Sequence, residues 1–179
     1  MRDPDADNAA AQQILVRRAR QLASAPRLAA PEAKLDVLVC RVRQELYAIE
    51  LRSSIAVLAA RGITGVPCTP PYIAGVLNVR GEILTVLDLA AALGLSASPS
   101  IQTDGQAERA RVVLVDAPHA RVGLLVEDVL DIRQIALDRL ARPLSDRAFV
   151  RGIADGHVVV LDLRSLLARE GLEVNEQPA

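Results

Sequence analysis

Aromatic residues are almost missing from this chain. Phe, Tyr and Trp make up 2% of the sequence, and Trp does not occur. Proteins that bind single-stranded nucleic acid stack the bases on aromatic rings, so this scarcity argues against that class. The formal net charge is −1, which gives no basic excess to neutralise phosphates. The sequence therefore predicts no nucleic-acid partner and a core of Val, Leu, Ile and Ala.

Long apolar runs are lacking as well. No uninterrupted run approaches the roughly 20 residues of a membrane helix, and the opening residues MRDPDADN are not followed by the apolar segment of a signal peptide. The two cysteines, Cys40 and Cys68, are expected to be reduced thiols because disulfides are unusual in the cytoplasm. We therefore expect a cytoplasmic protein without direct membrane insertion.

Catalytic motifs are also absent. His119 and His157 belong to different predicted turns, without metal-ligand spacing, and no P-loop, Gly-x-Ser-x-Gly or Gly-x-Gly-x-x-Gly is found. Asp88 and Asp162 each precede a short helix, which favours capping over acid–base chemistry or metal binding. Cys68 lies in a Pro-flanked loop without a nearby basic residue to activate it. We expect no catalytic residue, no metal and no cofactor.

Three parts are predicted along the chain: 1–34, 35–168 and 169–179. The first contains a disordered start, an amphipathic helix and a Pro-containing linker. In AAAQQILVRRARQLASA, the apolar residues Ala11, Leu15, Ala19 and Leu22 share one helical face. This helix either docks on the body of the protein or forms a partner-binding or oligomerising arm. The third part is a tail.

Short strands dominate from Asp36 onward. DVLVCRVRQELYAIEL predicts a hairpin, SSIAVLAA a short helix, and GVPCTPPYI a loop. GVLNVRGEILTVLDL predicts a second hairpin, and AAALGL a short helix closed by Gly94.

The same scheme recurs after a shift of roughly 75 residues. Val112 answers Val37, Gly152 answers Gly75, and Asp162 answers Asp88. The sequence therefore predicts two similar β units, each a small barrel of short antiparallel strands, with a shared core and a groove between them. Strand alternation predicts these buried residues: Val39, Val42, Ile49, Leu84, Val86, Leu114, Leu124 and Val159.

The two copies differ at one turn. The first copy has NVRGE where the second has ADG. Gly81 is explained by the positive φ of hairpin turns, and Asn78 is open to the same explanation. Arg80 is not, so it is either an ordinary exposed turn residue or a contact residue.

A family resemblance rests on this region. VPCTPPYIAGVLNVRGEILTVLDL, with ELYAIEL, RVGLLVEDVLDI and RGIADGHVVVLDLRSLL, resembles the CheW-like domain family from about Leu35 to about Leu167. The resemblance implies a mainly β fold of two intertwined SH3-like five-stranded barrels with short helices. It also implies a non-enzymatic adaptor of bacterial chemotaxis. Its partners would be the cytoplasmic tip of methyl-accepting chemoreceptors and the regulatory domain of a CheA-type histidine kinase.

The resemblance also assigns two partner surfaces. Asn78, Val79 and Arg80 would lie on the receptor side. The kinase side would comprise Val57, Ile63, Val66 and Gly75. Two departures remove charge from these surfaces, because Ala56 stands where the family has an acidic residue and Ala90 where it often has Arg.

Two alternatives to a standard chemotaxis adaptor remain at this point. One is a CheW-like paralogue that serves another pathway, such as motility or development. The other is a small-ligand-binding barrel, which would need a polar cluster inside, whereas the inward-facing strand positions are nearly all aliphatic.

Overall fold

The computed structural model describes residues 33–95, 109–116, 121–143 and 147–169. The predicted N-terminal helix, His119 and the tail after Arg169 lie outside these ranges. Residues from Lys34 onward form one compact unit.

Ten strands and two short α-helices are built from these residues, five strands and one helix from each sequence repeat. The first repeat contributes β1 (Lys34–Val42), β2 (Glu45–Glu50), β3 (Ser54–Ala59), β4 (Ile73–Val79), β5 (Glu82–Asp88) and α2 (Leu89–Ala92). The second contributes β6 (Arg111–Asp116), β7 (Arg121–Val126), β8 (Asp128–Ala136), β9 (Val150–Ala154), β10 (Val158–Leu161) and α3 (Leu163–Leu167). The 3-10 turns are η1 (Leu51–Ser53) and η2 (Leu137–Arg139).

The strands form two five-stranded sheets that do not coincide with the repeats. One sheet has the order β8-β1-β2-β10-β9, and the other β3-β6-β7-β5-β4. Each sheet keeps the first hairpin of one repeat and takes three strands from the other, so the two units are intertwined, as the family resemblance implies, and only the expectation of purely antiparallel strands is wrong. The repeats exchange strands, because β10 pairs in parallel with β2, and β5 with β7.

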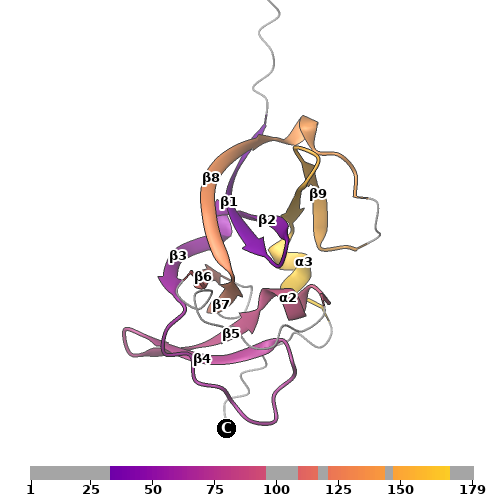
Figure 1. The fold of residues 1–179 in the computed structure, drawn as a ribbon. Coiled ribbons are helices and arrows are strands. Elements are labelled where there is room, and N and C mark those ends of the chain that lie inside the picture. Colours follow the sequence, from indigo (N-terminus) through magenta and orange to yellow (C-terminus); the bar gives the residue numbers. More distant parts are fainter. Residues whose placement is uncertain (1–32, 96–108, 117–120, 144–146, 170–179) are drawn as a thin grey trace, which may run out of the picture. The chain divides into compact units, whose positions relative to one another are not determined.

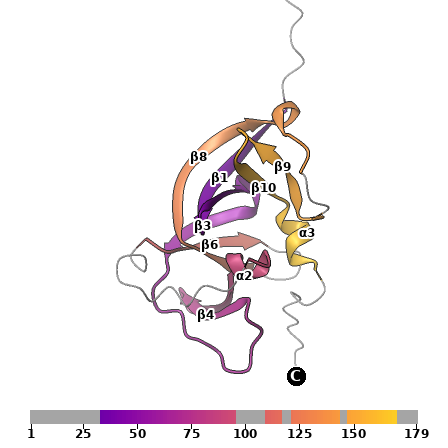
Figure 2. The same cartoon turned by 45° about the vertical axis from the view of Figure 1, so that its right-hand side comes forward.

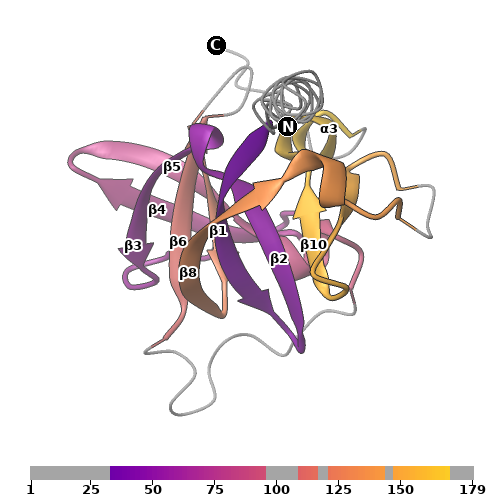
Figure 3. The same ribbon diagram turned by 90° about the horizontal axis from the view of Figure 1, so that it is seen from above.

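Figures 1 and 2 show β8 and β9 above α2 and α3 and β4 below them, and Figure 3 looks down onto the sheets with β3 and β4 to the left of β1 and β10 to its right. The hydrogen-bonded order among the described residues leaves β8 and β9 as the end strands of one sheet and β3 and β4 as those of the other. The mainly β prediction is confirmed, and the barrel form stays a prediction.

The predicted helix SSIAVLAA is wrong, since these residues include strand β3. Ala56 lies opposite Leu114, Val57 opposite Val113, and Leu58 opposite Val112. Pairing with β6 satisfies the backbone of this segment, and tertiary contacts of this kind override a weak local helix preference. The helical turn that exists here is η1, just before the strand.

The core is aliphatic, as expected. The largest cluster takes side chains from both sheets and from both helices, including Ile49, Leu124, Leu89 and Leu166, all fully buried. Seven of the eight residues predicted to be buried are so: Val39, Val42, Ile49, Leu84, Val86, Leu114 and Leu124. Val159 is only half-buried, because it lines an open hollow beside Phe149.

Asp88 and Asp162 cap the two short helices, as predicted. The Oδ1 atom of Asp88 accepts hydrogen bonds from Ala90 N at 2.9 Å and Ala91 N at 3.3 Å. Asp162 accepts from Ser165 N at 3.2 Å and from its Oγ at 2.8 Å. Both carboxylates therefore serve the fold.

Candidate functional site

The turn between β4 and β5 is a tight turn in which two consecutive residues have positive φ. Arg80 has a φ of 55° and Gly81 a φ of 92°. The side chain of Asn78 supports the turn, since its Oδ1 accepts a hydrogen bond from Gly81 N at 2.9 Å. Val79 is half-buried against a smaller core cluster that includes Leu77 and Leu84. Of the three predicted receptor-side residues, Asn78 and Val79 therefore have roles in the fold.

Arg80 has no such role among the described contacts. Its side chain is exposed, and no hydrogen bond or ion pair of the described residues involves it. The left-handed conformation costs a non-glycine residue about 1–2 kcal/mol. A fold-only explanation accounts for Gly81 and Asn78 but leaves Arg80 unexplained.

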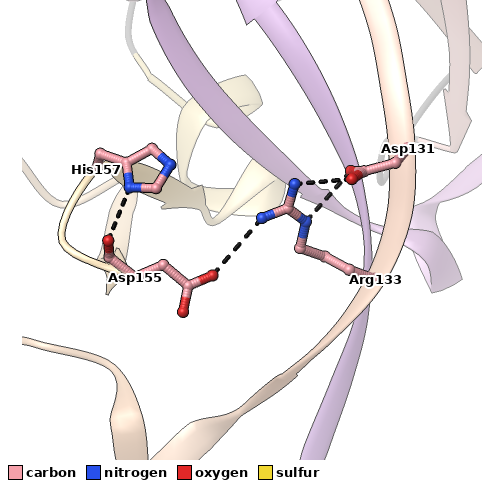
Figure 4. A network of polar contacts seen from close by, with 4 residues as sticks. All are labelled: Asp131, Arg133, Asp155 and His157. Carbon is pink, nitrogen blue, oxygen red and sulfur yellow. Dashed lines mark hydrogen bonds and ion pairs between the residues drawn. The ribbon is translucent and has the colours of Figure 1, made fainter.

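The equivalent turn of the second repeat provides a direct comparison. Asp155 and Gly156 have φ values of 50° and 75°, so the backbone is repeated. Asp155, however, is bound within the fold (Figure 4): its carboxylate lies 3.6 Å from Arg133 NH1, and its carbonyl oxygen lies 2.7 Å from His157 Nδ1. In the first repeat, Leu58 stands at the position that answers Arg133 and cannot form an ion pair. The first turn thus directs its charge to solvent.

The neighbourhood of Arg80 includes an apolar residue that the sequence reasoning missed. Ile83 lies opposite Asn78 in the β4–β5 register, and it is 68% exposed. Beside it, Arg121 NH1 is 3.1 Å from Glu82 Oε2, and Arg121 Nε is 3.6 Å from Asp116 Oδ1. The alternation of side chains along β5 could have predicted this exposure. Leu84 and Val86 point into the core, so Ile83 points to the other face of the strand.

The predicted kinase-side residues are only partly gathered. Val57 on β3 is 42% exposed and Val66 in the β3–β4 loop is 40% exposed, whereas Ile63 is half-buried and Gly75 is buried. Thr64 and Val76 exchange two backbone hydrogen bonds of 2.9 Å, which holds the loop against β4. Ile63 and Gly75 are therefore close to one another, while Val57 lies on the end strand at the other side of this sheet.

Gly75 is required by the fold whatever it binds. Its φ is 145°, and a Cβ at this position would lie 2.3 Å from the backbone oxygen of Thr64. Its repeat counterpart Gly152 faces Ala141 in the same way, with a Cβ position 3.0 Å from that residue's oxygen. A kinase contact near Gly75 stays a prediction that rests on its exposed loop neighbours.

The two departures from the family pattern lie at positions that pack. Ala90 is 6% exposed and lies in the largest core cluster, and Ala56 is partly buried against the smaller cluster that includes Leu77 and Leu84. A charged side chain at position 90 would have to point out of the core to stay solvated. Ala90 lacks that charge and packs in the core instead.

Other groups in the described ranges do not assemble a reactive centre. Cys40 and Cys68 are free thiols. Burial, with a smaller effect of Asp128, raises the pKa of Cys40 to about 12, which keeps it protonated and unreactive. No cluster of three or more His, Cys, Asp or Glu in this part of the chain is arranged to hold a metal ion. Within the same residues, no helix has the length and apolarity to cross a membrane.

Comparisons with known proteins decide the family. The family model described as the CheW-like domain matches residues 36–171. The chain belongs to the CheW-like domain family.

Individual CheW relatives agree with this assignment. The chain is 29% identical to the chemotaxis protein CheW of Rhizobium meliloti over 149 residues, covering 77% of this chain and 90% of that protein. It is 32% identical to a probable chemotaxis protein CheW of Rhizobium etli over 126 residues, covering 66% and 76% of the two chains. The crystal structure of the scaffolding protein TtCheW from Thermoanaerobacter tengcongensis matches with a TM-score of 0.68 at 27% identity, covering 82% of this chain and 96% of that one.

Proposed function

We propose that this CheW-like chain is a non-enzymatic adaptor of a bacterial chemosensory array, working in the cytoplasm and linking methyl-accepting chemoreceptors to a CheA-type histidine kinase. The adaptor role is supported by membership of a family whose relatives are named chemotaxis proteins and a scaffolding protein. Neither alternative has comparable support, and the clusters packed on both sheets are aliphatic, with no buried polar side chain among the described residues to bind a ligand there.

Arg80 is the observation that carries the receptor side of the proposal. It is held in a strained turn, exposed, and unused by the described fold, while its counterpart Asp155 is paired. A guanidinium is a rigid fork that fits a carboxylate or carbonyl on a receptor helix, with charge-assisted hydrogen bonds. Ile83 adds an apolar contact beside it.

The kinase side rests on different residues. Val57 and Val66 expose aliphatic surface on β3 and on the following loop. Exposed aliphatic side chains of this kind fit the aliphatic edge of a homologous β domain, which is what the family resemblance implies for the kinase regulatory domain.

The test is a reconstitution of receptor, kinase and this protein. We expect Arg80→Ala to keep the circular dichroism spectrum and to lose co-sedimentation and kinase activation. Arg80→Lys keeps the charge without the fork and should recover only part of the binding. Loss of charge-assisted hydrogen bonds of this kind corresponds to about 1.5–3 kcal/mol.

Arg139→Ala is the matched control, because Arg139 is an exposed arginine of η2, away from this turn. An Arg80→Ala protein that assembles and activates like the wild type would return Arg80 to the status of an ordinary turn residue. The receptor surface would then have to be sought in the groove expected between the barrels.

A further inference from the structure

A hollow beside the crossing from one sheet to the other is lined only by charged side chains. Its volume is about 260 Å³, and its lining consists of Arg41, Arg43, Arg109, Glu127 and Asp128. Three arginines and two acidic residues therefore border one small volume.

Strand pairing fixes the positions of these groups. Arg41 lies opposite Asp128 in the β1–β8 register, and the backbone N–H of Glu127 donates to the carbonyl of Arg41 at 3.1 Å. Arg111 is opposite Val126 at the end of the β6–β7 pairing, and Arg109 precedes it by two residues, near the bend at Glu127 where the chain leaves β7 for β8. The hollow thus has walls from β1, from the start of β8 and from the residues before β6.

Arg43 has a partner, whereas the other four charged side chains have none among the described residues. In the described part of the chain, no ion pair or side-chain hydrogen bond involves Arg41, Arg109, Glu127 or Asp128. Arg41, Glu127 and Asp128 are nevertheless half-buried. Partly desolvated charges of both signs that face a common space are complementary to a molecule that also carries both signs.

We propose that this hollow binds a small dipolar ion of the free α-amino-acid class. Arg41 and Arg109 would hold its carboxylate, and Glu127 and Asp128 its ammonium group. A simple anion would face the two acidic residues, and a simple cation the arginines. The volume is below the roughly 300–1,000 Å³ of pockets for drug-sized ligands, which suits a molecule of this size. The site shares no residue with the Arg80 turn, so it stands independently of the adaptor function.

The experiment titrates the ¹⁵N-labelled full chain by NMR with L-alanine and L-glutamate. Acetate and ethylamine serve as matched probes, because they carry the two charged groups of alanine separately. We expect saturable shifts of the backbone amides of Arg41, Arg109, Glu127 and Asp128 with the amino acids. The affinity for acetate and for ethylamine should be lower by at least about tenfold, since each can make only one set of charged contacts.

Variants locate the binding. Arg41→Gln, Arg109→Gln and Asp128→Asn should each weaken it about tenfold, since each removes a charge-assisted contact. Arg109 is exposed, so its variant is expected to fold even where the other two do not. Arg139→Gln is the control and should bind like the wild type. The proposal is overturned if neither amino acid gives saturable shifts, if acetate binds as well as alanine, or if Arg139→Gln weakens binding as much as Arg109→Gln.

Discussion

The guanidinium of Arg133 lies 3.6 Å from the carboxylate of Asp155, although β8 and the β9–β10 turn belong to opposite ends of their sheet. Arg133 is also held by Asp131 at 2.7 Å, and this hydrogen bond raises the pKa of the guanidinium. The two ends of the sheet are thus linked by side chains, in addition to the backbone bridge between Ala141, which follows β8, and Ile153 of β9.

The first prediction concerns this link. The side chain of Arg133 is 33% exposed and that of Asp155 is 64% exposed, so Arg133→Gln should lower the free energy of unfolding by no more than about 1 kcal/mol. The loss should shrink at high salt because exposed ion pairs are screened. Urea melts at low and high salt measure it, and an equal loss at both would show that packing, not charge, is responsible.

The second prediction concerns Gly75. Gly75→Ala should destabilise the fold by several kcal/mol, because its Cβ would overlap the oxygen of Thr64 in a backbone that L residues rarely adopt. Gly65→Ala is the control from the same loop, since a Cβ there meets nothing within 4 Å. Thermal melts compare the two. Equal melting temperatures would mean that the loop moves aside freely.

The third prediction separates strain from function at Arg80. Arg80→Gly relieves the cost of a positive φ, so its unfolding free energy should equal or exceed that of the wild type, by up to about 1 kcal/mol. Coupling to receptor and kinase should still fail, because the guanidinium is gone. A glycine variant that is more stable and also couples normally would rule out a functional reason for keeping arginine.

The fourth prediction uses Cys40. An unfolded thiol loses its proton near pH 9.0, whereas the folded one keeps it to about 12. The unfolded state therefore binds fewer protons in this window, and stability should fall as the pH rises, by up to about 1.4 kcal/mol per pH unit.

Cys40→Val should flatten that slope between pH 8 and 10. The range is kept below the ordinary titration of Tyr47, whose pKa is also raised by burial and its hydrogen bond to Glu45. Denaturant melts at several pH values provide the measurement. Parallel profiles for the two proteins would show that the Cys40 thiol is less protected than its burial indicates.

The fifth prediction tests the kinase side without disturbing Gly75. Val57→Glu puts a charge on an exposed strand position, so the fold should persist while capture of the kinase regulatory domain falls sharply. Ile83→Glu places the same charge on another exposed aliphatic position and should leave that capture unchanged. If both variants bind the kinase equally well, Val57 is not part of the contact.

Local patterns were sufficient to predict much of this fold. Alternation found the hairpins and the buried face, and the position of Asp88 and Asp162 before apolar turns predicted their capping. The exchange of strands between repeats could not be read in the same way. The exchange depends on which strand edges meet in space, such as β10 with β2. The sequence of one strand does not identify a partner strand so far along the chain.

The candidate site shows the same division. The comparison of NVRGE with ADG identified Arg80 from the sequence alone, because the second repeat forms the equivalent turn without an arginine. The role of Gly75 was hidden, since it arises from the approach of Thr64 across a loop. The helix predicted for SSIAVLAA failed for a related reason: pairing with β6 decided the conformation of a segment whose own preference is weak.

The exchange of strands has a consequence for how this protein comes to be folded. Neither sheet is complete until strands of the second repeat have emerged: β6 and β7 complete one sheet, and β8, β9 and β10 complete the other. Half of the strand pairings, β1–β8, β2–β10, β3–β6 and β5–β7, thus close long loops, and folding should be slow relative to a helical protein of equal length. During synthesis, the first half would wait with open strand edges, and two such halves from neighbouring ribosomes could supply one another with strands.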